Sequence, residues 1–267
     1  QSDANTNQRK ETWSTLNDQV FLNRWGALNP FVKQTSALVD HCARIRFPVY
    51  ACGYNWLQDN LQSAQRLKQR IEEIIKANNN GPSICQQVIL VTHSMGGLVA
   101  RACSELAGMS PNITGVVHGV MPALGSATAY KRVRAGTEGG AGVVIGPDAE
   151  TVSAVFANAP GALQLLPSHL YPMGWLRIGR GDKATFTALA SLPKQDPYTE
   201  IYGLPDTAGN SVRGAWWSLM REELINPAGL RSSGWNRYVE NLTKAKKFHT
   251  QLGMRYHRNT YAFYGAD

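Results

Sequence analysis

The stretch VILVTHSMGGLVAR, residues 88–101, decides the fold of this chain. It begins with an apolar run rich in Val and Ile, which is typical of a buried strand, and it passes at once into a glycine-rich segment that predicts a helix. Ser94 lies at the junction. A nucleophile needs this geometry, because a sharp strand-to-helix turn lifts its hydroxyl out at the carboxyl edge of the sheet. The usual pattern is G-x-S-x-G, and here Thr92 stands at the first position.

A second interpretation makes Ser94 only the N-cap of the helix, since serine is a favoured residue there. It does not explain why a strand, His93 and the pair Gly96 and Gly97 accompany the serine. We therefore interpret Ser94 as a catalytic nucleophile. The backbone N–H of Met95, at the positive end of the helix dipole, is the expected oxyanion donor.

Strands and helices alternate on both sides of this stretch. The runs 47–54 and 113–121 predict strands, and the apolar spacing over 57–75 predicts an amphipathic helix. This order indicates βαβ units, and hence an α/β fold with a mostly parallel sheet and helices on both faces. Later in the chain, helices are predicted at 151–166, 211–224 and 235–252, and a strand at 259–265.

The predicted organisation is one α/β domain with a large insertion. Residues 1–46 form an N-terminal arm and helix, 47–122 and 259–267 form the core, and 123–258 form a cap or lid between two strands of the sheet. Within the cap, Trp216 and its neighbours Trp217, Leu219 and Met220 form either a lid over an acyl pocket or part of the cap's own core.

Composition limits the function further. With 43% hydrophobic and 17% charged residues, the 267-residue chain is too apolar to be disordered, and it has no 18-residue apolar run to span a membrane. Its start has no apolar segment typical of a signal peptide. The net charge of +8 favours anionic partners, but no basic stripe with interleaved aromatics supports a nucleic-acid binder. The four cysteines have no metal-ligand spacing, so no metal is expected.

Residues 88–101 closely resemble the nucleophile elbow of α/β-hydrolase lipases, including the lecithin–cholesterol acyltransferase and GPI-inositol-deacylase-like groups. A wider resemblance, to bacterial type VI secretion phospholipase effectors and most to their third family, is carried by FPVYACGYNWLQDN, VVHGVMPALGSATAYKR, NAPGALQLLP and NTYAFYGAD. It implies a serine ester hydrolase that degrades membrane phospholipid through an acyl-enzyme on Ser94, with no cofactor. It also implies a toxin delivered by contact, with a secretion spike protein, into a rival's periplasm, and a cognate immunity protein that blocks it.

The remaining triad members are harder to assign. In α/β-hydrolases the acid follows a late strand and precedes the histidine. Asp267, after the strand predicted at 259–265, is the candidate acid, and an ordinary turn aspartate is the alternative. No histidine follows Asp267. The histidines after Ser94 precede it, and His118 is expected in the core; they are His118, His169, His249 and His257.

No strand and loop for a second oxyanion donor precede residue 47. The chain thus looks incomplete at both ends, and we expect it to be the middle of a longer enzyme that does not turn over an ester by itself. A second chain that supplies the missing parts and a degenerate hydrolase are the alternatives. A catalytically incomplete binding module with the same fold is the competing function.

Overall fold

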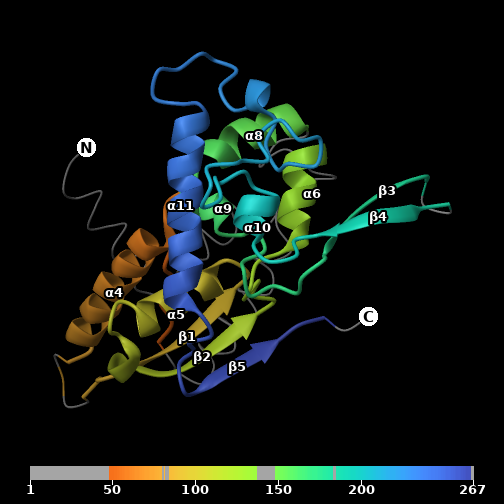
Figure 1. Ribbon diagram of the computed structural model, residues 1–267. Coiled ribbons are helices and arrows are strands. Elements are labelled where there is room, and N and C mark those ends of the chain that lie inside the picture. The colour runs from red at the N-terminus through yellow and green to blue at the C-terminus, as the bar shows by residue number, and fades with distance from the viewer. Residues whose placement is uncertain (1–47, 80, 82–83, 137–147, 183–184, 266–267) are drawn as a thin grey trace. The chain divides into compact units, whose positions relative to one another are not determined.

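The computed structural model describes residues 48–79, 81, 84–136, 148–182 and 185–265 (Figure 1). The arm and helix predicted over 1–46 lie outside these residues. The chain divides into two compact units. The smaller comprises 69–86 and the described part of 1–54, and the larger comprises 55–68 and 87–267. All the elements that position the candidate site belong to the larger unit.

A three-stranded parallel sheet carries the stretch that decided the fold. Its strands are β1 (Val88–His93), β2 (Ile113–Gly119) and β5 (Thr260–Phe263). They lie in the order β1-β2-β5, and both pairs are parallel, as predicted. The run 47–54 was expected to be a further strand. This prediction is wrong for the described residues, 48–54, which do not form a strand and do not pair with any strand of the described chain.

The crossover between β1 and β2 is the helix α5 (Gly96–Glu105), followed by the 3-10 turn η1 (Ser110–Asn112). Every α5 residue from position 97 to 104 is buried, and the helix contacts both strands. The amphipathic helix predicted over 57–75 is α4 (Asn60–Ala77). A parallel strand–helix–strand unit of this kind needs such a crossover, because parallel neighbours cannot be joined by a hairpin.

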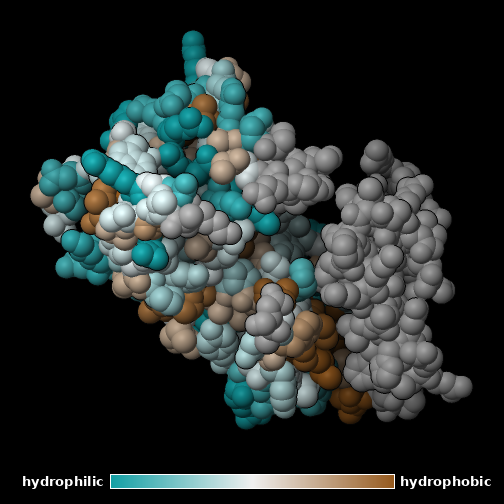
Figure 2. Space-filling view, turned by 90° about the vertical axis from the view of Figure 1, so that its right-hand side faces the viewer, coloured by the Kyte–Doolittle hydropathy of each residue, from teal (hydrophilic) through white to brown (hydrophobic). Residues whose placement is uncertain are grey.

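The two faces of the sheet differ. On one face Val116 and His118 are almost fully buried. On the other face, apolar side chains are exposed to solvent. Ile89 and Val91 on β1 and Phe263 on β5 are each at least half exposed. In Figure 2 hydrophobic residues gather low on the molecule, at the height of the sheet in Figure 1. Parallel sheets are normally covered on both faces, and within the described chain this face is uncovered.

Residues 123–258 contain most of the helices and a core of their own. The helices α8 (Ala149–Asn158) and α9 (Pro160–Leu163) pack against the long helix α11 (Trp235–Leu252) (Figure 1). Buried side chains fill the space among these elements, such as those of Phe156, Leu163, Tyr202 and Leu242. The elements are α6 (Ala127–Ala135), α8 (Ala149–Asn158), α9 (Pro160–Leu163), β3 (Leu176–Arg180), β4 (Thr187–Leu192), α10 (Pro197–Glu200), η3 (Glu222–Leu224) and α11 (Trp235–Leu252).

Several predictions for this region need correction. The single helix expected over 151–166 is interrupted, because Pro160 begins a new helix after an extended Ala159. The helix expected over 211–224 is wrong: those residues form turns and end in η3. The predicted helix over 235–252 and the late strand are confirmed as α11 and β5. None of the described helices has the length and apolar character that crossing a bilayer requires.

The tryptophan segment of the cap divides between its two interpretations. Leu219 and Met220 are 1% exposed and belong to the cap core. Trp216 is 64% exposed, and its carbonyl accepts a hydrogen bond from Arg134 on α6. Most of the segment is therefore core, and one indole stands out from it.

Candidate active site

Ser94 occupies the turn between β1 and α5 with a backbone φ of 50°. This left-handed conformation is costly for a residue with a Cβ, and it is characteristic of strained turns at functional sites. Two hydrogen bonds hold the turn: the Ser94 N–H donates to the carbonyl of Gly119 at 2.9 Å, and its carbonyl accepts from the Gly97 N–H at 3.0 Å. The side chain is half-buried. Ser94 therefore lies where β1 and β2 end, as the sequence predicted.

The glycine that follows is required by a close approach. A Cβ on Gly97 would lie 2.4 Å from the sulfur of Met121 and 2.9 Å from its Cβ. Met121 follows β2, so the loop after β2 presses directly on the first turn of α5. This contact explains why a small residue stands three positions after the serine.

The start of α5 offers backbone donors. The first bonds within the turn are made by the N–H groups of Gly97 and Leu98. Among the described residues, the N–H groups of Met95 and Gly96 donate no hydrogen bond that the geometry supports. Unpaired amides at a helix N-terminus carry positive partial charge, so an anion placed before them is stabilised. Met95 itself has a helical backbone and a buried side chain.

Thr92, the departure from the usual pattern, has a partner that sequence reasoning missed. Its hydroxyl lies 2.7 Å from Nδ1 of His118, the residue opposite it on β2. His118 is 1% exposed, and burial together with the nearby positive charge of Arg101 lowers its pKa to about 4. His118 is therefore a neutral, hydrogen-bonded core residue, in agreement with the sequence.

Two of the other three histidines after Ser94 make contacts away from it, whereas Nδ1 of the third, His169, is buried without a hydrogen-bond partner among the described residues. Nε2 of His249 lies 2.8 Å from the carbonyl of Gln164, and Nδ1 of His257 accepts from the N–H of Asn259. Both rings are buried. No hydrogen bond within the described part of the chain joins a histidine to Ser94. Asp267, the candidate acid, lies outside the described residues.

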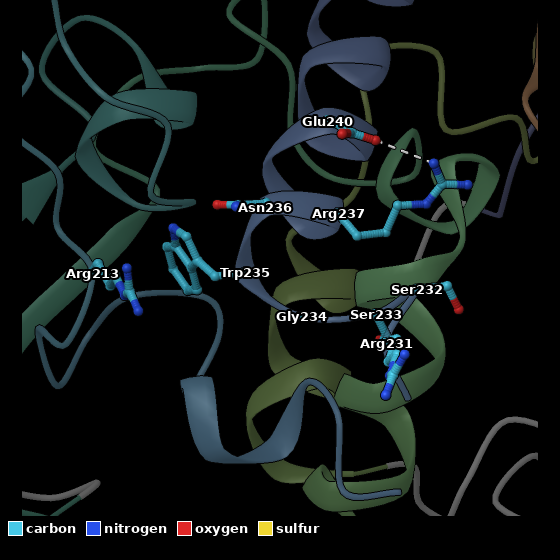
Figure 3. Close-up of a pocket in the computed structure, with 9 residues that line it drawn as sticks. All are labelled: Arg213, Arg231, Ser232, Ser233, Gly234, Trp235, Asn236, Arg237 and Glu240. Atoms are coloured by element: carbon cyan, nitrogen blue, oxygen red, sulfur yellow. Dashed lines mark hydrogen bonds and ion pairs between the residues drawn. The ribbon is translucent and has the colours of Figure 1, made fainter. Parts of the chain in front are cut away.

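A separate polar pocket of about 530 Å³ lies at the beginning of α11 (Figure 3). Arg213, Arg231 and Arg237 line it together with the helix start at Gly234. Two of these guanidinium groups are already ion-paired, Arg213 with Glu222 and Arg237 with Glu240. The pocket does not include Ser94. The pocket lies at the N-terminal end of α11, a helix of 18 residues that is about 27 Å long. Arg101 of the nucleophile helix contacts Gly253, which follows the other end of α11.

Comparisons with known proteins identify this architecture. Residues 54–130, which contain the elbow, match the family model described as a PGAP1-like alpha/beta domain. A chain in the solved structure titled "The crystal structure of Tle4-Tli4 complex" is 37% identical, with a TM-score of 0.68 over 81% of this chain. The fold is that of an α/β hydrolase. The predicted fold class is thereby confirmed, as is the resemblance of this hydrolase to a lipase effector.

The match covers only part of the solved chain. The chain spans 44% of the matched chain, less than half its length. None of the curated proteins matches it. The matched structure is of Tle4, so the assignment to the third lipase-effector family stays a prediction. The matches support a lipase-like α/β hydrolase.

Proposed function

We propose that this chain carries the nucleophile of a serine ester hydrolase that acts on membrane phospholipid. The observation that carries the proposal is the conformation of Ser94: a serine with φ 50° on a strand-to-helix turn, followed by two backbone amides that donate no hydrogen bond within the described part of the chain. A serine that served only as an N-cap would have a β-region backbone and accept a hydrogen bond from the helix start. Instead α5 begins without a side-chain cap.

The proposed reaction is an acyl transfer in two steps. The Ser94 hydroxyl attacks the ester carbonyl carbon, a histidine takes its proton, and the Met95 N–H stabilises the oxyanion. The alcohol leaves with the proton from that histidine, and water then releases the fatty acid from Ser94. A carboxylate, for which we propose Asp267, orients the histidine. The histidine itself is not among the described residues that contact Ser94.

The biological setting that we propose follows the Tle4-Tli4 match. Its title names a complex, which supports a protein partner for this chain, and we propose that the partner is a cognate immunity protein. The chain would then be a type VI secretion effector, delivered with a spike protein and active on phospholipid in the periplasm of a target cell.

Covalent labelling with a fluorophosphonate tests the nucleophile. The whole gene product, with whatever sequence its gene encodes on either side of these residues, should be labelled at Ser94 and release fatty acid from phospholipid vesicles. Ser94→Ala should abolish both, whereas Ser104→Ala, a control at a buried serine of the same helix, should retain them. Label elsewhere, or turnover that survives Ser94→Ala, would contradict the proposal.

A binding module with this fold is the second candidate. It is favoured by one observation, that the histidines His118, His249 and His257 are engaged elsewhere in the described chain. A folded whole gene product that neither reacts with fluorophosphonate nor hydrolyses vesicles, yet binds them, would favour the module.

A further inference from the structure

Arg101 is a buried cation that the proposed reaction has not used. It lies on α5, seven residues or about two turns after Ser94, and it is 2% exposed. No carboxylate of the described chain forms an ion pair with it. Burial lowers its pKa, while the nearby Tyr256 and Glu105 act in the opposite direction. A buried charge without an ion-pair partner is expensive, so its other contacts must compensate.

Backbone carbonyls provide that compensation. The Arg101 guanidinium donates Nη1 to the carbonyl of Ala123 at 3.1 Å and Nη2 to that of Gly253 at 2.9 Å. It also donates Nε and Nη2 to the carbonyl of Arg255, at 3.1 and 2.9 Å. The ring of Tyr256 lies 3.8 Å from the guanidinium carbon. The planar fork of arginine suits several acceptors at fixed angles, which a lysine ammonium does not reproduce.

The acceptors belong to two segments beside the candidate site. Ala123 lies in the loop after β2, two residues beyond Met121, which packs on Gly97 next to the nucleophile turn. Gly253 and Arg255 lie between α11 and β5, the strand that leads to the proposed acid. One side chain on the nucleophile helix therefore fixes both segments relative to Ser94.

We propose that Arg101 is a positioning residue, which holds the loop after β2 and the segment before β5 in register with the nucleophile helix. This inference rests on the proposed function, and it makes Arg101 act through those segments without contacting the substrate. A misplacement of about 1 Å at a reacting centre is enough to cost 10²-fold in rate. Loss of the fork should therefore lower kcat more than it raises KM.

The test uses Arg101→Lys, which keeps the charge, in the whole gene product. We expect kcat to fall about 10- to 100-fold with KM changed less than about threefold. In Arg101→Ala, ethylguanidinium should restore part of kcat in a saturable manner. The matched control is Arg177→Lys, an exposed arginine that also stacks on a ring, that of Phe186, and it should leave kcat unchanged.

Hydrogen exchange separates this inference from the proposed function. In Arg101→Lys, exchange should rise together in 121–125 and 253–259, while the loop 206–210, which Asp206 caps, keeps its wild-type rate. Wild-type kcat in a folded Arg101→Lys, faster exchange in only one segment, or a uniform rise across the chain would overturn the positioning role. Absence of Ser94-dependent turnover in the wild type would overturn the proposed function alone, because the exchange result does not depend on catalysis.

Discussion

Protonation of His249 should be a measurable part of the acid denaturation of this protein. The ring lies in the last turn of α11, where the helix dipole favours a positive charge, but it is only 4% exposed. Burial, the largest cause, lowers its pKa from 6.5 to about 4; the hydrogen bond to the Gln164 carbonyl acts against this, and His169 and Arg101 add to it. The folded state therefore excludes a proton that the unfolded chain binds below pH 6.5.

The sign and size follow from this difference. Between pH 6.5 and 4 the unfolded state binds more protons, so the free energy of unfolding falls as the pH falls. One group with this shift contributes at most about 3 kcal/mol over the window, at about 1.4 kcal/mol per pH unit. The stability is fully present above pH 6.5 and is lost progressively as the pH falls toward 4.

Urea denaturation at intervals between pH 7.5 and 4 measures the effect. His249→Gln removes the titrating group, so its curve of unfolding free energy against pH should be flatter than that of the wild type by about 3 kcal/mol in total. Thr250→Ala, an exposed and non-titrating neighbour on the same helix, is the control and should keep the wild-type slope. Parallel curves for His249→Gln and the wild type would refute the reasoning, because another group would then carry the loss.

Three further substitutions probe the elbow and its support. Ser94→Gly should raise the free energy of unfolding, measured in urea, by about 1 kcal/mol, because glycine adopts a φ of 50° without strain. Fluorophosphonate labelling should disappear in the same variant. A variant less stable than the wild type would argue against backbone strain at this turn. Gly97→Ala should lower the free energy of unfolding by about 1–3 kcal/mol, because the new methyl group forces Met121 to move. The control Gly265→Ala, at a position with open space around it, should change this free energy little, and equal urea midpoints for the two variants would contradict the close approach. Gln164→Leu should lower the free energy of unfolding by about 2–4 kcal/mol, because it leaves the buried N–H of Asn60 without its acceptor and removes the donor to Asp59. A thermal denaturation midpoint within a degree of the wild type would show that other groups replace these two hydrogen bonds.

Local signals account for what the sequence could predict. The elbow is written in consecutive residues, so β1, the turn at Ser94 and α5 follow from a run of β-branched residues and two glycines. The long helix α11 has enough apolar positions at helical spacing to be recognised by itself. The stretch 211–224 lacks this periodicity. Its apolar residues Leu219 and Met220 are buried, but they lie in turns and not in a helix.

Contacts between distant residues account for what it could not. The hydroxyl of Thr92 reaches a histidine 26 positions away, and nothing in either local pattern indicates that pairing. Arg101 is separated from Arg255 by 154 positions, so its role depends on a loop geometry that no spacing encodes. The hairpin β3–β4 was missed for a related reason. Its β4 side chains are almost all exposed, and a strand without a buried face shows no alternation to detect.

Burial decides which of these histidines are unsuited to serve as the base. It lowers the pKa values of both His118 and His249 to about 4, and the charge of Arg101 acts in the same direction. An imidazole with such a pKa accepts a proton poorly at neutral pH, so these two rings are unsuited to activate Ser94. A catalytic base matched to its task titrates near the operating pH. We therefore expect kcat/KM of the whole gene product to rise with pH through a midpoint near 6 to 7, and to keep that midpoint in His118→Asn and His249→Gln. A midpoint near 4 that either substitution abolishes would instead make that histidine the base and reverse the assignment.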